Sequence, residues 1–400
     1  MSQATARAAL AYSCVGHVYS HLFEPIFFVV ALALPKAMGI PYEDALMLII
    51  AGKLLYGVLA PVAGLLGDRW SAVGMMVVYF FGLGLAAVAT GFATTPFQLA
   101  LGLAGLGFFG SIYHPVGTAW LVRNAHNRGK VLGINGIFGG LGSALGGIVA
   151  GALADAFGWQ AAFLVPGLLV LATGLVFCVS LARRQVVEIK EDLKPTPPPS
   201  RGETWRAGII LTLTMLCTGM VYQVTMPALP KLFEARLGNY LGEGLLGVGL
   251  MVTVIYASAG LFQVVAGHWA DRYPLRNVYG LVYLAQVPLL AMAAILGGPP
   301  LFAVALAMVA FNHAGIPTEN SLLARYTPAR WRGTAFGLKF ILSFGVSGLG
   351  VPLMAIILKA TGDFLWVFVM LAVMAGFVAA MSLLLPQDKP GGAVAAEAAA

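Results

Sequence analysis

One charged turn occurs twice in this chain, about 200 residues apart, and each copy lies between long apolar segments. The first copy is 64–70 (GLLGDRW) and the second is 267–273 (GHWADRY). Of the 400 residues, 60% are hydrophobic and only 10% are charged. A soluble surface of this size needs more charge, whereas a lipid-facing surface needs almost none. The repeat therefore predicts two related membrane-embedded halves that use the same turn.

The apolar segments predict an all-α integral membrane protein with twelve transmembrane helices in two pseudo-symmetric six-helix halves. Twelve spans of roughly 20 residues each fit into this length and leave little for a soluble domain. The expected spans of the first half are 9–36, 43–66, 72–92, 97–122, 130–156 and 160–182. Those of the second half are 206–232, 244–269, 277–296, 300–324, 333–359 and 364–385.

The predicted organisation is a six-helix bundle over 1–182, a linker over 183–205, a second bundle over 206–386 and a disordered tail over 387–400. The linker combines charged residues with the proline-rich run 195–199, and such a segment does not stay helical or buried. It is expected to connect the halves on the cytoplasmic side.

The distribution of basic residues predicts the orientation. Of the 23 Lys and Arg residues, 17 lie in the tails and the even-numbered loops, four lie near the opposite face and two lie inside spans. By the positive-inside rule, both termini of this multi-pass protein lie in the cytoplasm, as in a bacterial-type inner (plasma) membrane. The net charge of +7 is thus explained by topology, and no nucleic-acid partner is expected.

The first span carries His17, His21 and Glu24, which are four and three residues apart and so share one helical face. An ionisable group at membrane depth is costly unless it faces partners or water, so this face is expected to point inward. It could bind substrate or exchange protons, or it could form an interhelical hydrogen-bond network. Because one helix face rarely completes a coordination shell, neither a metal site nor any other cofactor is predicted. The cysteines Cys14 and Cys217, like the third at position 178, show no metal-ligand spacing.

Two lysines lie inside predicted spans. Lys53 is about ten residues into the second span, and Lys339 is about six residues into the eleventh. A buried lysine persists when it pairs with a carboxylate or meets an anionic substrate. Glu24 is the expected partner of Lys53, and protonation of Glu24 would then free the lysine. This is a hypothetical coupling step.

Polar side chains coincide with prolines in the fourth and tenth spans, beside Pro115 and Pro317. Broken spans of this kind supply free carbonyls and polar groups for a site at the membrane midplane, although a kink can also serve packing alone. The candidate substrate- and proton-binding residues of the whole chain are His17, His21, Glu24, Lys53, Tyr113, His114, Asn312, His313, Glu319 and Lys339.

Charged residues also recur at the expected cytoplasmic ends of the spans. They could form bridges between neighbouring helices that close this side of the protein, or the arginines could serve as topological anchors. The recurring aspartate favours gating, because aspartate contributes little to topology. The candidate gating residues are Asp68, Arg69, Arg128, Asp271, Arg272 and Arg332.

With these residues identified, the chain resembles the major facilitator superfamily over almost its whole length. The loop signature Gly-x-x-x-Asp-Arg stands at 64–69, and the same pattern stands at 267–272. In the fifth span, Gly133, Gly142 and Gly146 keep the spacing of the glycines in the antiporter signature of that superfamily. The resemblance implies the twelve-helix fold and suggests export by antiport.

Within the superfamily, the chain is most similar to the fosmidomycin-resistance type of efflux protein. The residues that carry this likeness are 20–22 (SHL), 61–64 (PVAG) and 113–115 (YHP). The resemblance implies a transporter of the inner membrane whose substrate is a small molecule.

The leading functional hypothesis is a proton-coupled secondary transporter that exports a small molecule, with anions among the candidates, by alternating access. The absence of a Walker-type loop indicates that an ion gradient supplies the energy. The alternative is proton-coupled uptake of a small organic anion recognised by Lys53 and Lys339. A membrane-embedded enzyme lacks support, because no nucleophile–base–orienter constellation is present, and a non-transporting sensor is a further alternative. The expected partners are substrate, protons and the lipid bilayer, and the expected state is a monomer.

Overall fold

The computed structural model describes residues 3–124, 128–188, 200–242, 244–328 and 332–386, and these parts of the chain are helical and contain no strand. The first half comprises α1 (Gln3–Val30), α2 (Leu34–Met38), α3 (Tyr42–Met47), α4 (Ile50–Val58), α5 (Ala60–Arg69), α6 (Ala72–Gly91), α7 (Pro96–Gly110), the π-helical turn η1 (Tyr113–Gly117), α8 (Thr118–Arg123), α9 (Arg128–Phe157) and α10 (Ala161–Ala182). The second half comprises α11 (Arg201–Leu241), α12 (Leu246–Arg272), α13 (Leu275–Ile295), α14 (Gly298–Tyr326), α15 (Arg332–Phe340), the π-helical η3 (Ile341–Val346), the 3₁₀ turn η4 (Ser347–Leu349), α16 (Gly350–Thr361) and α17 (Leu365–Ser382).

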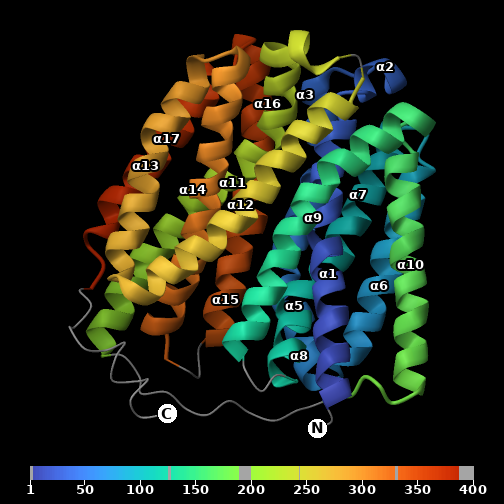
Figure 1. The fold of residues 1–400 in the computed structure, drawn as a ribbon, viewed down its shortest axis with the longest axis vertical. Helices are drawn as coiled ribbons and strands as arrows, with labels where there is room; N and C mark the ends of the chain where they lie inside the picture. The colour runs from blue at the N-terminus through green and yellow to red at the C-terminus, as the bar shows by residue number, and fades with distance from the viewer. Residues whose placement is uncertain (1–2, 125–127, 189–199, 243, 329–331, 387–400) are drawn as a thin grey trace.

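The two sets of helices lie side by side (Figure 1). The helices of the first half occupy one side, those of the second half occupy the other, and α9 and α12 meet along the seam. We call the end where α1 begins the terminal end and the opposite end, near α2 and α3, the far end. The expected fold class is confirmed, whereas the expected domain boundaries stay a prediction.

Ten helices in the described ranges are long and apolar enough to cross a membrane, and a bent pair adds an eleventh. That pair joins 42–58 to 60–69 with a bend of 41°, at a point where Pro61 begins α5. The twelfth span is α1, whose 28 residues are long enough. Its hydropathy is reduced by His17, His21 and Glu24, so the helix that carries the predicted polar face is the one that looks least like a membrane span.

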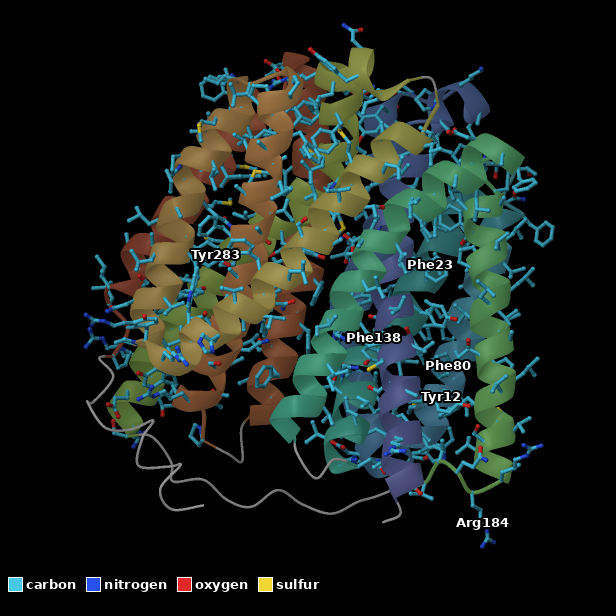
Figure 2. The ribbon with its side chains drawn as sticks, in the orientation of Figure 1. Tyr12, Phe23, Phe80, Phe138, Arg184 and Tyr283 are labelled. Carbon is cyan, nitrogen blue, oxygen red and sulfur yellow. The ribbon has the colours of Figure 1, made fainter. Side chains whose placement is uncertain are left out.

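Aromatic side chains fill the interior of each half. Figure 2 shows Phe80 within the first half and Tyr283 within the second, and both are buried. Arg184, just after α10, points away from the helices at the terminal end.

The glycines of α9 allow this helix to pack closely on two neighbours. A methyl group at Gly142 would collide with the carbonyl oxygen of Val18 in α1. On another face, a methyl group at Gly147 would lie 2.5 Å from the carbonyl oxygen of Gly249 in α12. Helices in lipid associate through such close backbone contacts, because lipid offers no hydrophobic driving force. The glycines of α9 therefore allow close packing within the first half at Gly142 and between the two halves at Gly147.

Polar contacts also join the halves at the far end. The Asp155 carboxylate, at the end of α9, accepts hydrogen bonds from the backbone amides of Leu245 (2.9 Å) and Leu246 (2.8 Å) at the start of α12. A carboxylate at this position satisfies amides that have no partner within the helix and interacts favourably with the helix dipole. Asp44 also pairs with Lys359 across the seam, at 3.7 Å.

We predict that Gly147→Ala destabilises the protein by about 1–3 kcal/mol, because the added methyl group separates α9 from α12. Thermal unfolding of the purified protein in detergent measures this. Gly133→Ala in the same helix is the control, since no described atom lies within 4 Å of its added methyl group. Equal unfolding temperatures for the two variants would contradict the packing role.

Candidate functional site

A small cavity of about 60 Å³ lies between the two halves and contains buried charge. Its charged and amide groups are Glu24 from α1, Lys53 from α4 and Gln223 from α11, and Tyr19, Ser20 and Tyr56 add hydroxyl groups. The remaining lining is apolar and aromatic and includes Phe23 and, from the second half, Phe344. Pockets that hold drug-sized ligands are typically about 300–1,000 Å³. Among the described residues, this cavity is therefore smaller than a typical site for an organic substrate.

Lys53 and Glu24 form an ion pair in this cavity, as predicted from the sequence. The Lys53 ammonium also donates to the side-chain oxygen of Gln223, at 2.5 Å. The Lys53 side chain is 5% exposed, whereas that of Glu24 is 23% exposed. The carboxylate is thus the more accessible member of the pair.

Gln223 carries this contact across the seam. Its amide nitrogen donates to the Ser343 carbonyl at 3.2 Å, within η3, so its oxygen is directed towards Lys53. Sequence reasoning missed Gln223, because a lone glutamine in an apolar span has no spacing pattern. The buried ion pair of the first half is therefore hydrogen-bonded to the second half.

A second buried ion pair lies within the second half. The Lys339 ammonium contacts Glu319 at 2.8 Å and donates to the Asn320 side chain at 2.6 Å. Thr218 and Tyr279 donate to the other Glu319 oxygen, at 2.9 and 2.8 Å. Both ions are almost fully buried, and neither lines the cavity. Sequence reasoning named both residues but did not pair them.

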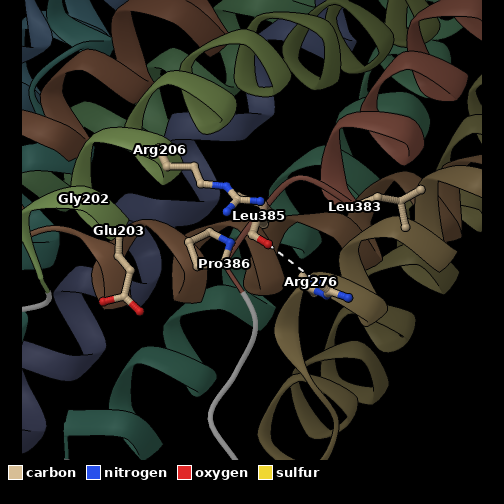
Figure 3. A pocket seen from close by; sticks show the side chains of 7 residues that line it. All are labelled: Gly202, Glu203, Arg206, Arg276, Leu383, Leu385 and Pro386. Carbon is tan, nitrogen blue, oxygen red and sulfur yellow. Dashed lines mark hydrogen bonds between the residues drawn. The ribbon is translucent and has the colours of Figure 1, made fainter.

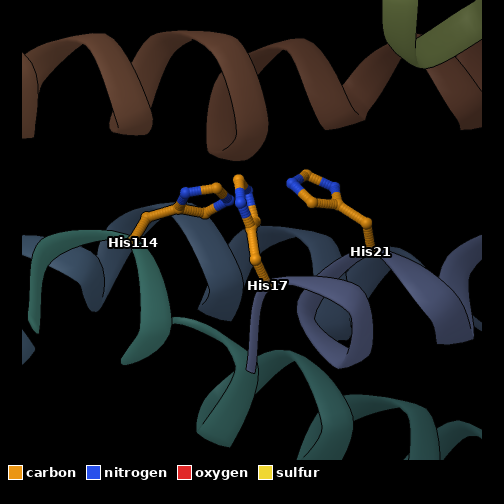
Figure 4. Close-up of side chains that lie close together, drawn as sticks. All are labelled: His17, His21 and His114. Carbon is orange, nitrogen blue, oxygen red and sulfur yellow. The ribbon is translucent and has the colours of Figure 1, made fainter. Parts of the chain in front are cut away.

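A π-helical turn brings a third histidine to the predicted polar face of α1. Pro115 has no N–H to donate to a preceding carbonyl, and the chain accommodates this with η1 instead of a regular helix. The ring of His114, which lies in this turn, meets those of His17 and His21. Figure 4 shows the three imidazoles converging on one region.

A larger hollow of about 580 Å³ lies away from these charges, at the terminal end of the second half (Figure 3). Its arginines are already bonded to the end of α17. Arg206 donates to the Leu384 carbonyl at 2.7 Å, and Arg276 donates to the Leu385 carbonyl at 3.4 Å. Because all of its lining belongs to one half, it is not the cavity between the halves.

The family model of the Major Facilitator Superfamily matches residues 14–239 and 211–400, which is nearly the whole chain. The chain belongs to the Major Facilitator Superfamily. The finer resemblance to the fosmidomycin-resistance type is not confirmed by the matches and stays a prediction.

Several transporters of Pseudomonas putida and other bacteria are similar to this superfamily member. The 4-hydroxybenzoate transporter PcaK of P. putida is 27% identical in an alignment that covers 74% of this chain and 72% of that protein. The gallate transporter of P. putida is 26% identical and covers 74% of this chain and 73% of its own length. The multidrug resistance protein MdtG of Salmonella newport is 30% identical, but over only 32% of each chain.

A solved structure supports the same fold. The crystal structure of a bacterial homolog to the human lysosomal transporter Spinster superposes with a TM-score of 0.74 at 14% identity and covers 96% of this chain and 95% of that chain. The solved structure supports the fold, while the family match and the relatives support a multi-pass membrane protein of secondary transport.

Other predicted binding residues lie behind the cavity. The Tyr113 hydroxyl donates to the Ser13 carbonyl at 2.6 Å and accepts from Asn135 at 2.8 Å, while its ring stacks on His17. His313 bonds the Val309 carbonyl through Nδ1, at 3.0 Å, and Asn312 beside it is also buried.

The structure describes the side chains of three of the six predicted gating residues. Asp68 accepts a hydrogen bond from Arg123 at 2.5 Å, which links α5 to α8 within one half. Arg69 and Arg272 are exposed at the terminal end. The side chains of Arg128, Asp271 and Arg332 lie outside the described residues. The gating role of these residues stays a prediction.

We predict that Lys339→Met destabilises the protein by about 3–5 kcal/mol, because Glu319 keeps its charge without a cation. The double variant Lys339→Met/Glu319→Gln should recover most of that loss. Thermal unfolding in detergent measures both. Lys359→Met is the control, since this lysine side chain is 71% exposed and its pair with Asp44 contributes little. If Lys339→Met were as stable as Lys359→Met, the Lys339–Glu319 ion pair would not stabilise the second half.

Proposed function

We propose that this protein is a proton-coupled symporter that imports a small aromatic organic anion. The observation that carries the proposal is the Lys53–Glu24 pair in a cavity between the halves. The ammonium is the anion-binding group, and the Glu24 carboxylate is the proton-binding group. This proposal takes up the second of the two sequence-based transport hypotheses.

The pair favours an anion as substrate. A buried ammonium requires a negative partner, because an unpaired charge at membrane depth is costly. Glu24 provides that partner in the present conformation, and a substrate carboxylate provides it when Glu24 is neutral. The Gln223 oxygen continues to accept from Lys53 beside the bound carboxylate, as it does in the present conformation.

The same pair gives the sign of proton coupling. Protonation of Glu24 frees Lys53 for the anion, and a bound anion in turn makes it easier to neutralise Glu24. Proton and anion therefore bind more tightly together than alone, and this coupling is reciprocal. Two ligands that promote each other's binding are carried in the same direction. An antiporter, as suggested by the glycine spacing, needs them to compete.

The walls of the cavity favour an aromatic substrate. Phe23, Tyr56 and Phe344 contribute rings around the buried charges, and rings pack well against other rings. The two relatives that match about three quarters of the chain are named for 4-hydroxybenzoate and gallate, which are both aromatic carboxylates. The multidrug resistance relatives match a third of it.

The small size of the cavity fits a transport cycle. We infer that the halves separate at one end to admit the anion. That end then closes, and the opposite end opens. In superfamily folds, substrate sites lie near the midplane between the halves, and motion of one half against the other changes access. With both termini in the cytoplasm, the far end faces the outside.

The direction of coupling is tested in proteoliposomes with radiolabelled 4-hydroxybenzoate. Symport predicts accumulation inside the vesicles when the outside is acidic, and this accumulation should disappear with a protonophore. Antiport predicts accumulation only when the inside is acidic. Accumulation of the second kind would overturn the proposal of symport and leave the exporter hypothesis in its place.

We predict that Glu24→Gln separates binding from coupling. The amide keeps Lys53 available, so the variant should still exchange labelled for unlabelled anion. It should lose accumulation driven by the pH gradient, because residue 24 can no longer bind a proton. Lys53→Met should lose both activities, whereas Glu43→Gln, an acidic residue of α3 at the far end, should keep both. A Glu24→Gln variant with normal gradient-driven accumulation would exclude Glu24 as the proton site.

A further inference from the structure

Three histidines from two separate elements meet beside the cavity. His17 and His21 lie in α1, and His114 lies in η1. Their ligand nitrogens all lie within 4.8 Å of one another. We propose that His17, His21 and His114 bind a divalent transition-metal ion of the Zn²⁺, Co²⁺ or Ni²⁺ class. The expectation of no metal site considered only the ligands on α1, and the π-helical turn supplies the ligand that was missing.

The spacing of the rings fits a three-histidine site. The ring centroids are 5.1 Å apart for His17 and His21, 5.2 Å for His17 and His114, and 5.0 Å for His21 and His114. With metal–nitrogen bonds of about 2.05 Å and tetrahedral angles, three ligating imidazoles have centroids about 5 Å apart. The rings thus already have the required separation. Binding needs them to turn so that their nitrogens approach to about 3.4 Å.

Two of the ligand nitrogens are available to a metal ion. His17 Nδ1 lies 2.7 Å from the carbonyl oxygen of Asn135, which can only accept, so Nδ1 carries the proton and Nε2 does not. Metal-binding histidines are typically oriented by this kind of second hydrogen bond. His114 Nε2 is buried and has no hydrogen-bond partner among the described residues. An unpartnered buried nitrogen is costly, and a metal ion would satisfy it.

The ligand set and its surroundings select the class of ion. Three neutral imidazoles without a thiolate suit Zn²⁺, Co²⁺ and Ni²⁺, whereas Mg²⁺ and Ca²⁺ prefer oxygen ligands. Lys53 and Lys339 are cations close enough to act on these histidines, and each is balanced by a carboxylate, Glu24 for Lys53 and Glu319 for Lys339. Three protein ligands leave one tetrahedral position open, as in metal sites that accept an exogenous ligand.

Gly139 in α9 provides the space that the His17 ring occupies. A methyl group at this position would lie 2.6 Å from His17 Nε2. Gly139→Ala therefore displaces a ligand nitrogen without removing any ligand. Gly136, three residues earlier in α9, has no described atom within 4 Å of an added methyl group. The two substitutions form a matched pair.

The test uses Co²⁺ with the full-length protein, purified in detergent through a tag that lacks histidine. Tetrahedral Co²⁺ has visible absorption bands, and isothermal titration with Zn²⁺ gives the affinity and the number of ions bound. We expect one ion per chain. His114→Gln should weaken binding by about 100-fold or more, Gly139→Ala should weaken it by about 10-fold to 100-fold, and Gly136→Ala should leave it unchanged.

Thermal unfolding of each apo variant separates loss of the site from loss of the fold. Zn²⁺ should also raise the unfolding temperature of the parent protein and of Gly136→Ala, but not that of His114→Gln. No binding to the parent protein, or binding that is unchanged in both His114→Gln and Gly139→Ala, would overturn the proposal. The titrations contain no organic anion, so their outcome does not depend on the proposed transport activity.

Discussion

A lysine buried between two apolar halves needs a negative charge beside it, and this need constrains much of the molecule. Lys53 obtains that charge from Glu24, which links α1 to α4, and it obtains a further bond from Gln223 of the second half. The most polar part of α1 therefore faces the seam and not lipid. Because Gln223 joins this pair to the second half, a change in the charge of the pair alters a contact between the halves. A membrane protein has few other means of making helix packing sensitive to a proton.

The two halves can move against each other only if their contacts are close but not held by interdigitated side chains. The glycines of α9 supply a face on which backbones meet closely, at Gly142 against α1 and at Gly147 against α12. Such a face has few interdigitated side chains, so helices can slide along it at little cost. At the far end, by contrast, Asp155 holds the first amides of α12 through directed hydrogen bonds. Directed bonds at one end and smooth packing in the middle suit the movement of one half against the other that we propose.

The sequence alone is sufficient for the fold and for the first ion pair, for physical reasons. Apolar spans must be about 20 residues long to cross a bilayer, so their number can be read directly. Glu24 and Lys53 are ionisable groups that cannot stay unpaired at membrane depth, and few candidates were available. The third histidine could not be placed in this way. Its position depends on how Pro115 reshapes the backbone, and η1 turns the side chain by an amount that no helical periodicity predicts. Gln223 and Asn135 are neutral, so burying them does not require a charged partner. Their partners could therefore not be inferred from the sequence.

The two buried ion pairs show how one architecture can serve two purposes. Glu319 accepts from Thr218 and Tyr279 in addition to its contact with Lys339, so its oxygens are saturated within one half. Neutralising it would break several bonds at once, and the pair acts as a brace. Glu24 is more exposed, and its described charged partner is Lys53 alone. Neutralising it disturbs one ion pair, and the freed lysine still keeps Gln223. In the proposed mechanism, the number of hydrogen bonds to each carboxylate thus decides which of the two pairs stays fixed and which one switches.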